Sequence, residues 1–99
     1  MPKSDIIVVG ASAGGVQALK KVAADLPSNL PAAVFAVLHI GMGINGSSAL
    51  PSILARAGRL PAKHPRDGEE IRPGIIYIAP PDCHMLLSPG CIHLSGGPK

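Results

Sequence analysis

The chain has 99 residues and a formal net charge of +3, with 46% hydrophobic and 15% charged residues. This length and composition fit one small soluble domain and leave no room for two. The longest apolar run, residues 32–38, is too short for a membrane-spanning helix of about 20 residues, and residues 6–9 are too few for a secretory signal. We therefore expect a cytoplasmic protein without membrane insertion.

Aromatic residues are nearly absent, with one Phe, one Tyr and no Trp. We therefore expect an aliphatic core. The same scarcity removes the stacking platforms that a single-strand nucleic-acid binder needs, and the basic residues between positions 56 and 72 are interspersed with acidic ones. Nucleic acid is not an expected partner.

The first half of the chain predicts a βαβ unit. Residues 6–9 are continuously apolar and β-branched, as in a strand buried on both faces of a parallel sheet. A glycine-rich break at 10–15 follows, and apolar residues then recur with helical spacing from Val16 to Leu26, where Pro27 ends the helix. Residues 33–38 predict a second buried strand, so strand, helix and strand form one right-handed unit.

The second half predicts shorter elements. Ser47 or Ser48 caps a helix that ends at Gly58, and Pro61 excludes a central strand around it. The remaining expected elements are an edge strand at 60–64, a strand at 75–79 and hairpin strands at 84–87 and 91–94. This order predicts an α/β fold with a doubly wound, mostly parallel sheet and a C-terminal β-hairpin.

Two cysteines, Cys83 and Cys91, flank the predicted hairpin turn. With a two-residue turn, Ser88 faces Cys91 and Cys83 faces Gly96, so the two thiols are out of register for a disulfide. We expect both thiols to be free, as is typical of a reducing cytoplasm.

Ser12 and His39 follow the first two predicted strands. In an open parallel sheet, reactive groups gather at the carboxyl ends of the strands. If these two strands are neighbours, about 4.8 Å apart, the His39 imidazole comes within hydrogen-bond reach of the Ser12 hydroxyl, which is the geometry of a nucleophile and its base. The N-terminus of the following helix offers donors for an oxyanion. The arrangement suits acyl transfer.

Two other interpretations of these residues stay open. A serine between a strand and a helix is commonly an N-cap, and a histidine at a strand end is commonly just packed. A glycine-rich turn into a helix is also an anion site, which suggests an anion- or nucleotide-binding module. However, the glycines at 10, 14 and 15 do not have the dinucleotide-binding spacing, and His39 stands where such a site places an acid.

Three segments together resemble the catalytic domain of the CheB family, the chemotaxis protein-glutamate methylesterases. DIIVVGASAGG (5–15) is similar to the family's strand and nucleophile turn, and AVLHI (36–40) is similar to its histidine strand. The downstream signature is matched by Asp67-Gly68, by PGIIYIAP (73–80) and by His84. Each segment alone is moderately specific, but their order and spacing together are highly specific.

The resemblance implies a doubly wound serine hydrolase that demethylates glutamate methyl esters on chemoreceptors in chemotaxis signalling, and that also deamidates glutamines there. Ser12 matches the family's nucleophile, His39 matches its general base and acid, and the backbone N–H of Ala13 matches one oxyanion donor. The expected partner is a methylated chemoreceptor. Neither a cofactor nor a metal is implied.

The resemblance has two departures. Ala13 stands where many family members have threonine. The match also covers only about the N-terminal half of the family domain, so the catalytic aspartate is not expected in this chain, and neither is a receiver domain. None of the carboxylates at 67, 69, 70 and 82 is at the matching position. We expect a truncated domain over residues 1–99 that self-associates through an exposed sheet edge; the alternative is a non-catalytic remnant or a chemosensory binding module.

Other histidines and cysteines have weaker signals. Cys83, His84, Cys91 and His93 lack a standard zinc spacing, and the alternation of a hairpin is expected to place their side chains on both faces. We expect no metal site there. His64 is expected at the surface.

Overall fold

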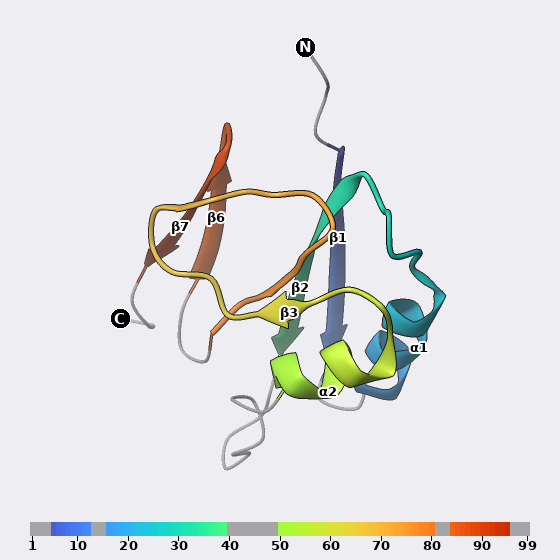
Figure 1. Ribbon diagram of the computed structural model, residues 1–99. Helices are drawn as coiled ribbons and strands as arrows, with labels where there is room; N and C mark the ends of the chain where they lie inside the picture. The colour runs from blue at the N-terminus through green and yellow to red at the C-terminus, as the bar shows by residue number, and fades with distance from the viewer. Residues whose placement is uncertain (1–4, 13–15, 40–49, 81–83, 96–99) are drawn as a thin grey trace.

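The computed structural model describes residues 5–12, 16–39, 50–80 and 84–95 (Figure 1). In chain order the elements are β1 (Asp5–Ser12), α1 (Val16–Asp25), β2 (Ala32–His39), α2 (Leu50–Ala57), β3 (Ala62–Lys63), β4 (Glu69–Glu70), β5 (Ile76–Ile78), β6 (His84–Ser88) and β7 (Cys91–Ser95). The predicted α/β class, mostly parallel sheet and C-terminal hairpin are confirmed. The short strand β4 has no signal in the sequence and was not expected.

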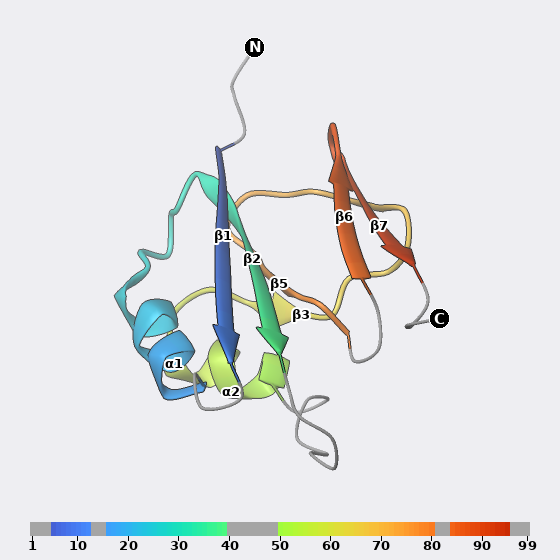
Figure 2. The same cartoon turned by 180° about the vertical axis from the view of Figure 1, so that it is seen from behind.

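The main sheet has the strand order β1-β2-β5-β3, and each neighbouring pair in it is parallel. β3 lies at one edge, as Pro61 predicts. β5 lies between β2 and β3, and its three residues are all buried. Because the four strands are parallel, their carboxyl ends lie at the same end of the sheet. In Figure 2 this is the end towards the two helices.

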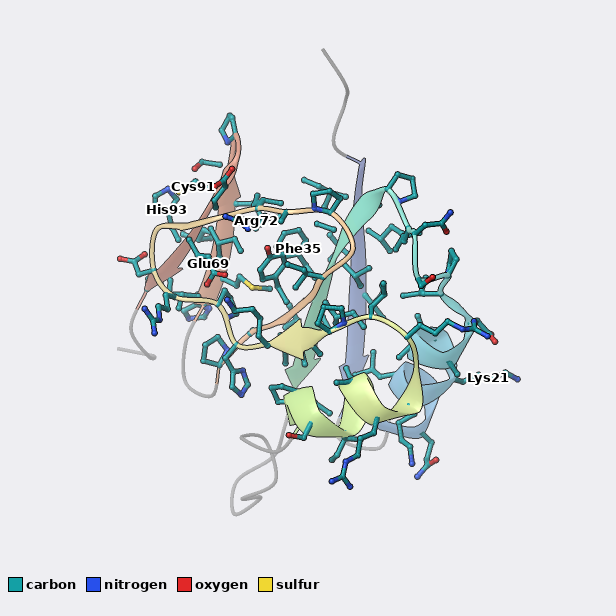
Figure 3. The ribbon with its side chains drawn as sticks, viewed as in Figure 1. Lys21, Phe35, Glu69, Arg72, Cys91 and His93 are labelled. Carbon is teal, nitrogen blue, oxygen red and sulfur yellow. The ribbon has the colours of Figure 1, made fainter. Side chains whose placement is uncertain are left out.

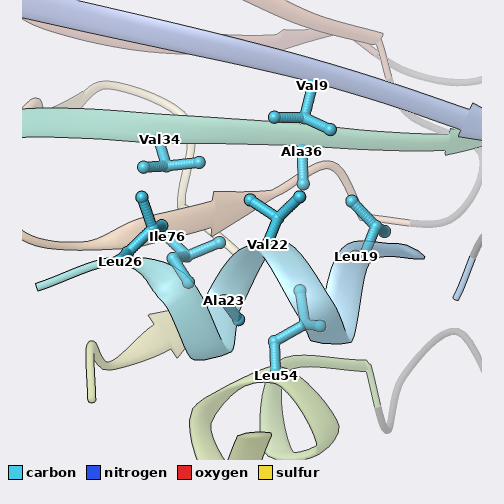
Figure 4. A pocket seen from close by; sticks show the side chains of 9 residues that line it. All are labelled: Val9, Leu19, Val22, Ala23, Leu26, Val34, Ala36, Leu54 and Ile76. Atoms are coloured by element: carbon cyan, nitrogen blue, oxygen red, sulfur yellow. The ribbon is translucent and has the colours of Figure 1, made fainter. Parts of the chain in front are cut away.

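Both helices pack on the same face of this sheet. Leu19 and Ala23 of α1 and Leu54 of α2 form a core cluster with Val34 of β2 and Ile76 of β5. Figure 4 shows the small space left between these side chains, which amounts to about 10 Å³. One water needs about that much room, so this space is packed core and not a ligand site.

The opposite face of β2 and β5 is covered by a second, antiparallel sheet with the order β4-β7-β6. The cluster between the two sheets contains Ala33, Phe35, Tyr77 and Ile92. The Phe35 and Tyr77 rings stack with centroids 5.2 Å apart, and Figure 3 shows Phe35 between β2 and the hairpin. The expectation of an aliphatic core is therefore wrong on this face, where the two aromatic residues of the chain lie together.

β1 is less buried than its sequence predicts. Ile6 is 45% exposed and Val8 is 65% exposed, so the expectation that residues 6–9 are buried on both faces is wrong. The cause is the strand order: β1 is the outermost strand of the described sheet, whereas the helices and the second sheet cover mainly β2 and β5. Val9 packs against the helix-side cluster.

Candidate active site

Ser12 and His39 are the last residues of β1 and β2. The two strands pair in parallel from Asp5 opposite Ala32 to Ser12 opposite His39. Paired residues of adjacent strands are separated by the strand spacing of about 4.8 Å. The expectation that these two strands are neighbours is confirmed, and the register brings the backbones of the two predicted site residues directly side by side.

Of these two strands, β2 is the one that pairs on both sides. Its residues from Ala32 to Ala36 are buried, and β5 lies along its other side. The N–H of Val34 donates to the carbonyl of Ile75, and the N–H of Ala79 donates to the carbonyl of Ala36, each over 3.0 Å. The strand that ends at His39 is therefore held on both sides by backbone hydrogen bonds, which restricts the position of its carboxyl end.

α1 begins at Val16, four residues after Ser12 in the chain. Figure 2 shows the start of this helix beside the carboxyl end of β1. A helix N-terminus carries partial positive charge and unpaired N–H groups, which favour a developing oxyanion. Ala13, the predicted oxyanion donor, lies outside the described residues, as do Ser47 and Ser48.

His64 also lies at the carboxyl end of a strand of the main sheet, immediately after β3. Its Nδ1 is 3.0 Å from the carbonyl oxygen of Ile78 at the end of β5, and its Nε2 is buried without a hydrogen-bond partner in the described part of the chain. The expectation of a surface histidine is therefore wrong, because the contact with β5 draws the ring inwards. The sequence signal that could have placed it at this end of the sheet is its position directly after a strand.

An ion pair joins Lys63 of β3 to Glu69 of β4, with 2.5 Å between Nζ and Oε2. The backbone N–H of Arg66 donates to Oε1 of Glu69 over 2.8 Å. Burial raises the pKa of the Glu69 carboxyl, but the hydrogen bonds and positive charges of Lys63 and Arg66 outweigh it, so this pKa lies below its ordinary value. The pair ties β3 to β4.

The hairpin register confirms that Ser88 faces Cys91. The same register places His84, Cys91 and His93 on one face of the hairpin, so the expectation that alternation separates them is wrong for these three. Within the described ranges, no three His, Cys, Asp or Glu side chains are grouped closely enough to hold a metal ion. Cys91 is a free thiol, whereas Cys83 lies outside the described residues.

Residues 7–99 match the family model described as CheB methylesterase. The chain belongs to this family. A protein-glutamate methylesterase/protein-glutamine glutaminase 3 of Anaeromyxobacter dehalogenans is 40% identical over 88 residues, which are 89% of this chain and 25% of that protein. A protein-glutamate methylesterase/protein-glutamine glutaminase of Thermotoga maritima is 40% identical over 82 residues, which are 83% of this chain and 23% of that protein.

The fold agrees with a solved member of the CheB family. The crystal structure of the Thermotoga maritima CheB methylesterase catalytic domain matches this chain with a TM-score of 0.77 and 32% identity, over 97% of this chain and 51% of that one. The chain therefore spans about a quarter of these curated relatives and about half of the solved domain. No helix in the described ranges is long and apolar enough to cross a membrane.

Proposed function

We propose that this chain supplies the nucleophile and the base of a protein-glutamate methylesterase, with Ser12 as nucleophile and His39 as general base and acid. The observation that carries this proposal is the parallel register that ends with Ser12 opposite His39, in a chain that belongs to the CheB methylesterase family. Two adjacent strand ends of a parallel sheet are a site where such a pair can act on a substrate outside the sheet.

The proposed reaction has two steps. The Ser12 oxygen attacks the carbonyl carbon of a glutamate methyl ester while His39 accepts the hydroxyl proton, and His39 then gives that proton to the departing methanol. Water hydrolyses the acyl-serine by the same route and restores Ser12. With a glutamine side chain the leaving group is ammonia. The backbone N–H of Ala13 and the N-terminus of α1 stabilise the oxyanion.

The carboxylate that orients His39 is proposed to come from outside these 99 residues, because none of the acidic residues at 67, 69, 70 and 82 is at the family's position. Without that carboxylate, histidine loses its productive tautomer, which costs about 10⁴ in turnover in the serine proteases. The isolated chain is therefore expected to be several orders of magnitude slower than a complete domain.

We propose a methylated chemoreceptor as the substrate protein, in cytoplasmic chemotaxis signal transduction, with no cofactor. The names of the relatives, which specify glutamate methylesterase and glutaminase activity, support this substrate class. Among the described residues, β1 pairs on one side only, which supports a further proposal, that the isolated chain self-associates.

The test measures methanol release from methylated receptor by this chain and by a version extended with the remaining half of a related catalytic domain. We expect slow release from the first and fast release from the second. Ser12→Ala and His39→Gln should abolish release from both, whereas Ser52→Ala, at an exposed serine of α2, should not. Unchanged release after Ser12→Ala would contradict the proposed nucleophile, and no release from any version would favour a non-catalytic binding module.

A further inference from the structure

The hairpin carries a second serine–histidine pair. Ser88 is the last residue of β6, and His93 lies in β7. Ser88 faces Cys91 in the register and His93 faces Leu86, so the two side chains are diagonal neighbours on one face of the hairpin. The Ser88 Oγ and the His93 Nε2 are 2.9 Å apart. This is the contact that a serine nucleophile makes with its base.

Asp67 lies on the other side of the same imidazole. Its Oδ1 accepts a hydrogen bond from the N–H of Leu94 over 2.8 Å, which fixes the carboxylate beside β7, and this oxygen is 3.9 Å from the His93 Nδ1. A carboxylate facing Nδ1 favours the tautomer that carries its proton there, and Nε2 is then free to accept the Ser88 proton.

A groove of about 340 Å³ lies beside Ser88. It runs between the hairpin turn and the amino end of β1, which is the end of that strand remote from Ser12. Apart from Ser88, its lining is apolar or glycine: Ile6, Ile71, Leu87, Pro89 and Gly90. Leu87 and Ser88 are consecutive residues of β6, so their side chains point to opposite faces of the hairpin. The groove lies on the Leu87 face, whereas the Ser88 Oγ and His93 lie on the outer face, so an acyl donor would reach Ser88 from solvent.

We propose that Ser88 is a second, acyl-accepting nucleophile, with His93 as its base and Asp67 as the positioning residue, and that it takes acyl groups from activated esters. The Ser88 oxygen bonds to the acyl carbon as His93 Nε2 takes its proton. The ester C–O bond then breaks, and the leaving alcohol receives that proton. Neither Ser12 nor His39 takes part.

The exposure of Ser88, His93 and Asp67 to solvent limits the rate of turnover. The side chains of His93 and Asp67 are 52% and 69% exposed, and Figure 3 shows His93 on the hairpin surface. Water therefore screens the charges that develop during the reaction, whereas fast turnover needs a dry, preorganised site. We expect one acylation per chain followed by slow hydrolysis.

The test uses the Ser12→Ala chain, so that every signal arises elsewhere. It is treated with an alkyl fluorophosphonate, and the labelled residue is identified by mass spectrometry. We expect labelling of Ser88 but not of Ser95, an exposed serine on the same face of the hairpin. Because a general base contributes about 10²–10⁴, His93→Gln should lower the Ser88 labelling rate at least about tenfold, and imidazole in solution should restore part of it in His93→Gly.

Acylation by p-nitrophenyl esters tests the other two parts of the cluster. Asp67→Asn should lower the maximal acylation rate without changing the half-saturating ester concentration, and Asp67→Glu should restore the rate. The hexanoate should react no faster than the acetate, because the apolar groove lies on the opposite face of the hairpin from the Ser88 Oγ. Circular dichroism checks that each variant folds. Three results would each overturn the proposal. They are equal labelling of Ser88 and Ser95, acylation of Cys91 in place of Ser88, and a rate that His93→Gln leaves unchanged.

Discussion

The Tyr77 side chain joins the two sheets through both its ring and its hydroxyl. The ring is fully buried and stacks on Phe35. The hydroxyl accepts a hydrogen bond from the N–H of Arg72 over 2.9 Å and donates one to the carbonyl of Glu70 over 3.3 Å. Both partners belong to or follow β4, so this one side chain fixes the second sheet against the first.

Tyr77→Phe keeps the stacked ring and removes the hydroxyl. The Arg72 N–H, whose hydrogen bond to this hydroxyl is partly buried, then loses its acceptor. We therefore expect the free energy of unfolding to fall by about 0.5–1.5 kcal/mol, measured by urea denaturation. Arg72→Ala is the matched control, because it keeps the backbone N–H and removes only an exposed side chain. Arg72→Ala should change the free energy of unfolding by no more than about 0.5 kcal/mol. Equal losses in the two variants would show that the hydroxyl contributes little.

Glu69 makes stability dependent on pH. Its pKa is lowered in the folded chain, so in acid the unfolded chain binds its proton first. The contribution of the Glu69 carboxylate to the free energy of unfolding is therefore complete above pH 4.5, the ordinary pKa of this group. It is lost as the pH falls through the lower pKa of the folded chain. Glu69→Gln should remove this part of the pH dependence in thermal unfolding followed between pH 7 and about pH 3. Glu70→Gln, at a more exposed carboxylate, should change the profile less.

At the scale of the elements, Gly58 ends α2 where this helix meets α1. A Cβ atom added at Gly58 would lie 2.0 Å from the carbonyl oxygen of Ala23 and 2.6 Å from its carbon. These are backbone atoms in the last turn of α1, so no side-chain rotation can relieve the contact. The close approach of the two helices therefore requires glycine at this position.

Gly58→Ala should force α2 away from α1 and lower the free energy of unfolding by about 1–3 kcal/mol or more, as overpacking does in cores. Gly10→Ala is the matched control, because a Cβ atom at Gly10 meets nothing within 4 Å. Urea denaturation of both variants provides the measurement. If Gly58→Ala were as stable as Gly10→Ala, the helices would have to approach each other less closely than the structure shows.

The elements differ in how far the sequence predicts them. β1 follows from a continuous apolar, β-branched run, β2 follows from a continuous apolar run, and the hairpin follows from its Pro-Gly turn. β4 has no such signal, since Glu69 and Glu70 are both acidic; it forms because β7 offers a backbone partner and Lys63 holds the Glu69 carboxylate. Burial of β1 could not be predicted from its own residues, because burial depends on which elements pack beside the strand.

The residues of the candidate site also differ in how far the sequence predicts their positions. The positions of Ser12 and His39 follow from the ends of two strands, and the register adds that they are directly opposite. The inward position of His64 depends on the pairing of β3 with β5, and the contact between Ser88 and His93 depends on a diagonal across the hairpin. Both are tertiary arrangements that local sequence patterns do not contain.

At the scale of the whole molecule, β1 is an edge strand of the main sheet in the part of the chain that the structure describes. Within the described ranges it pairs with β2 alone, and its residues from Ile6 to Ser12 carry no charge and no proline. Native edge strands are commonly blunted by lysine, proline or a bulge. The exposed Ile6 and Val8 side chains add apolar surface next to the unpaired backbone groups.

We therefore expect the isolated chain to form oligomers that grow with concentration in sedimentation velocity experiments. Val8→Lys should shift the chain towards monomer, because a lysine on an edge strand repels its copy across the interface. Leu86→Lys is the matched control: it replaces another exposed apolar residue, 57% accessible on the outer face of the hairpin, and leaves the β1 edge intact. If Leu86→Lys dissolved the oligomers and Val8→Lys did not, the hairpin face would be the contact and the edge of β1 would be excluded.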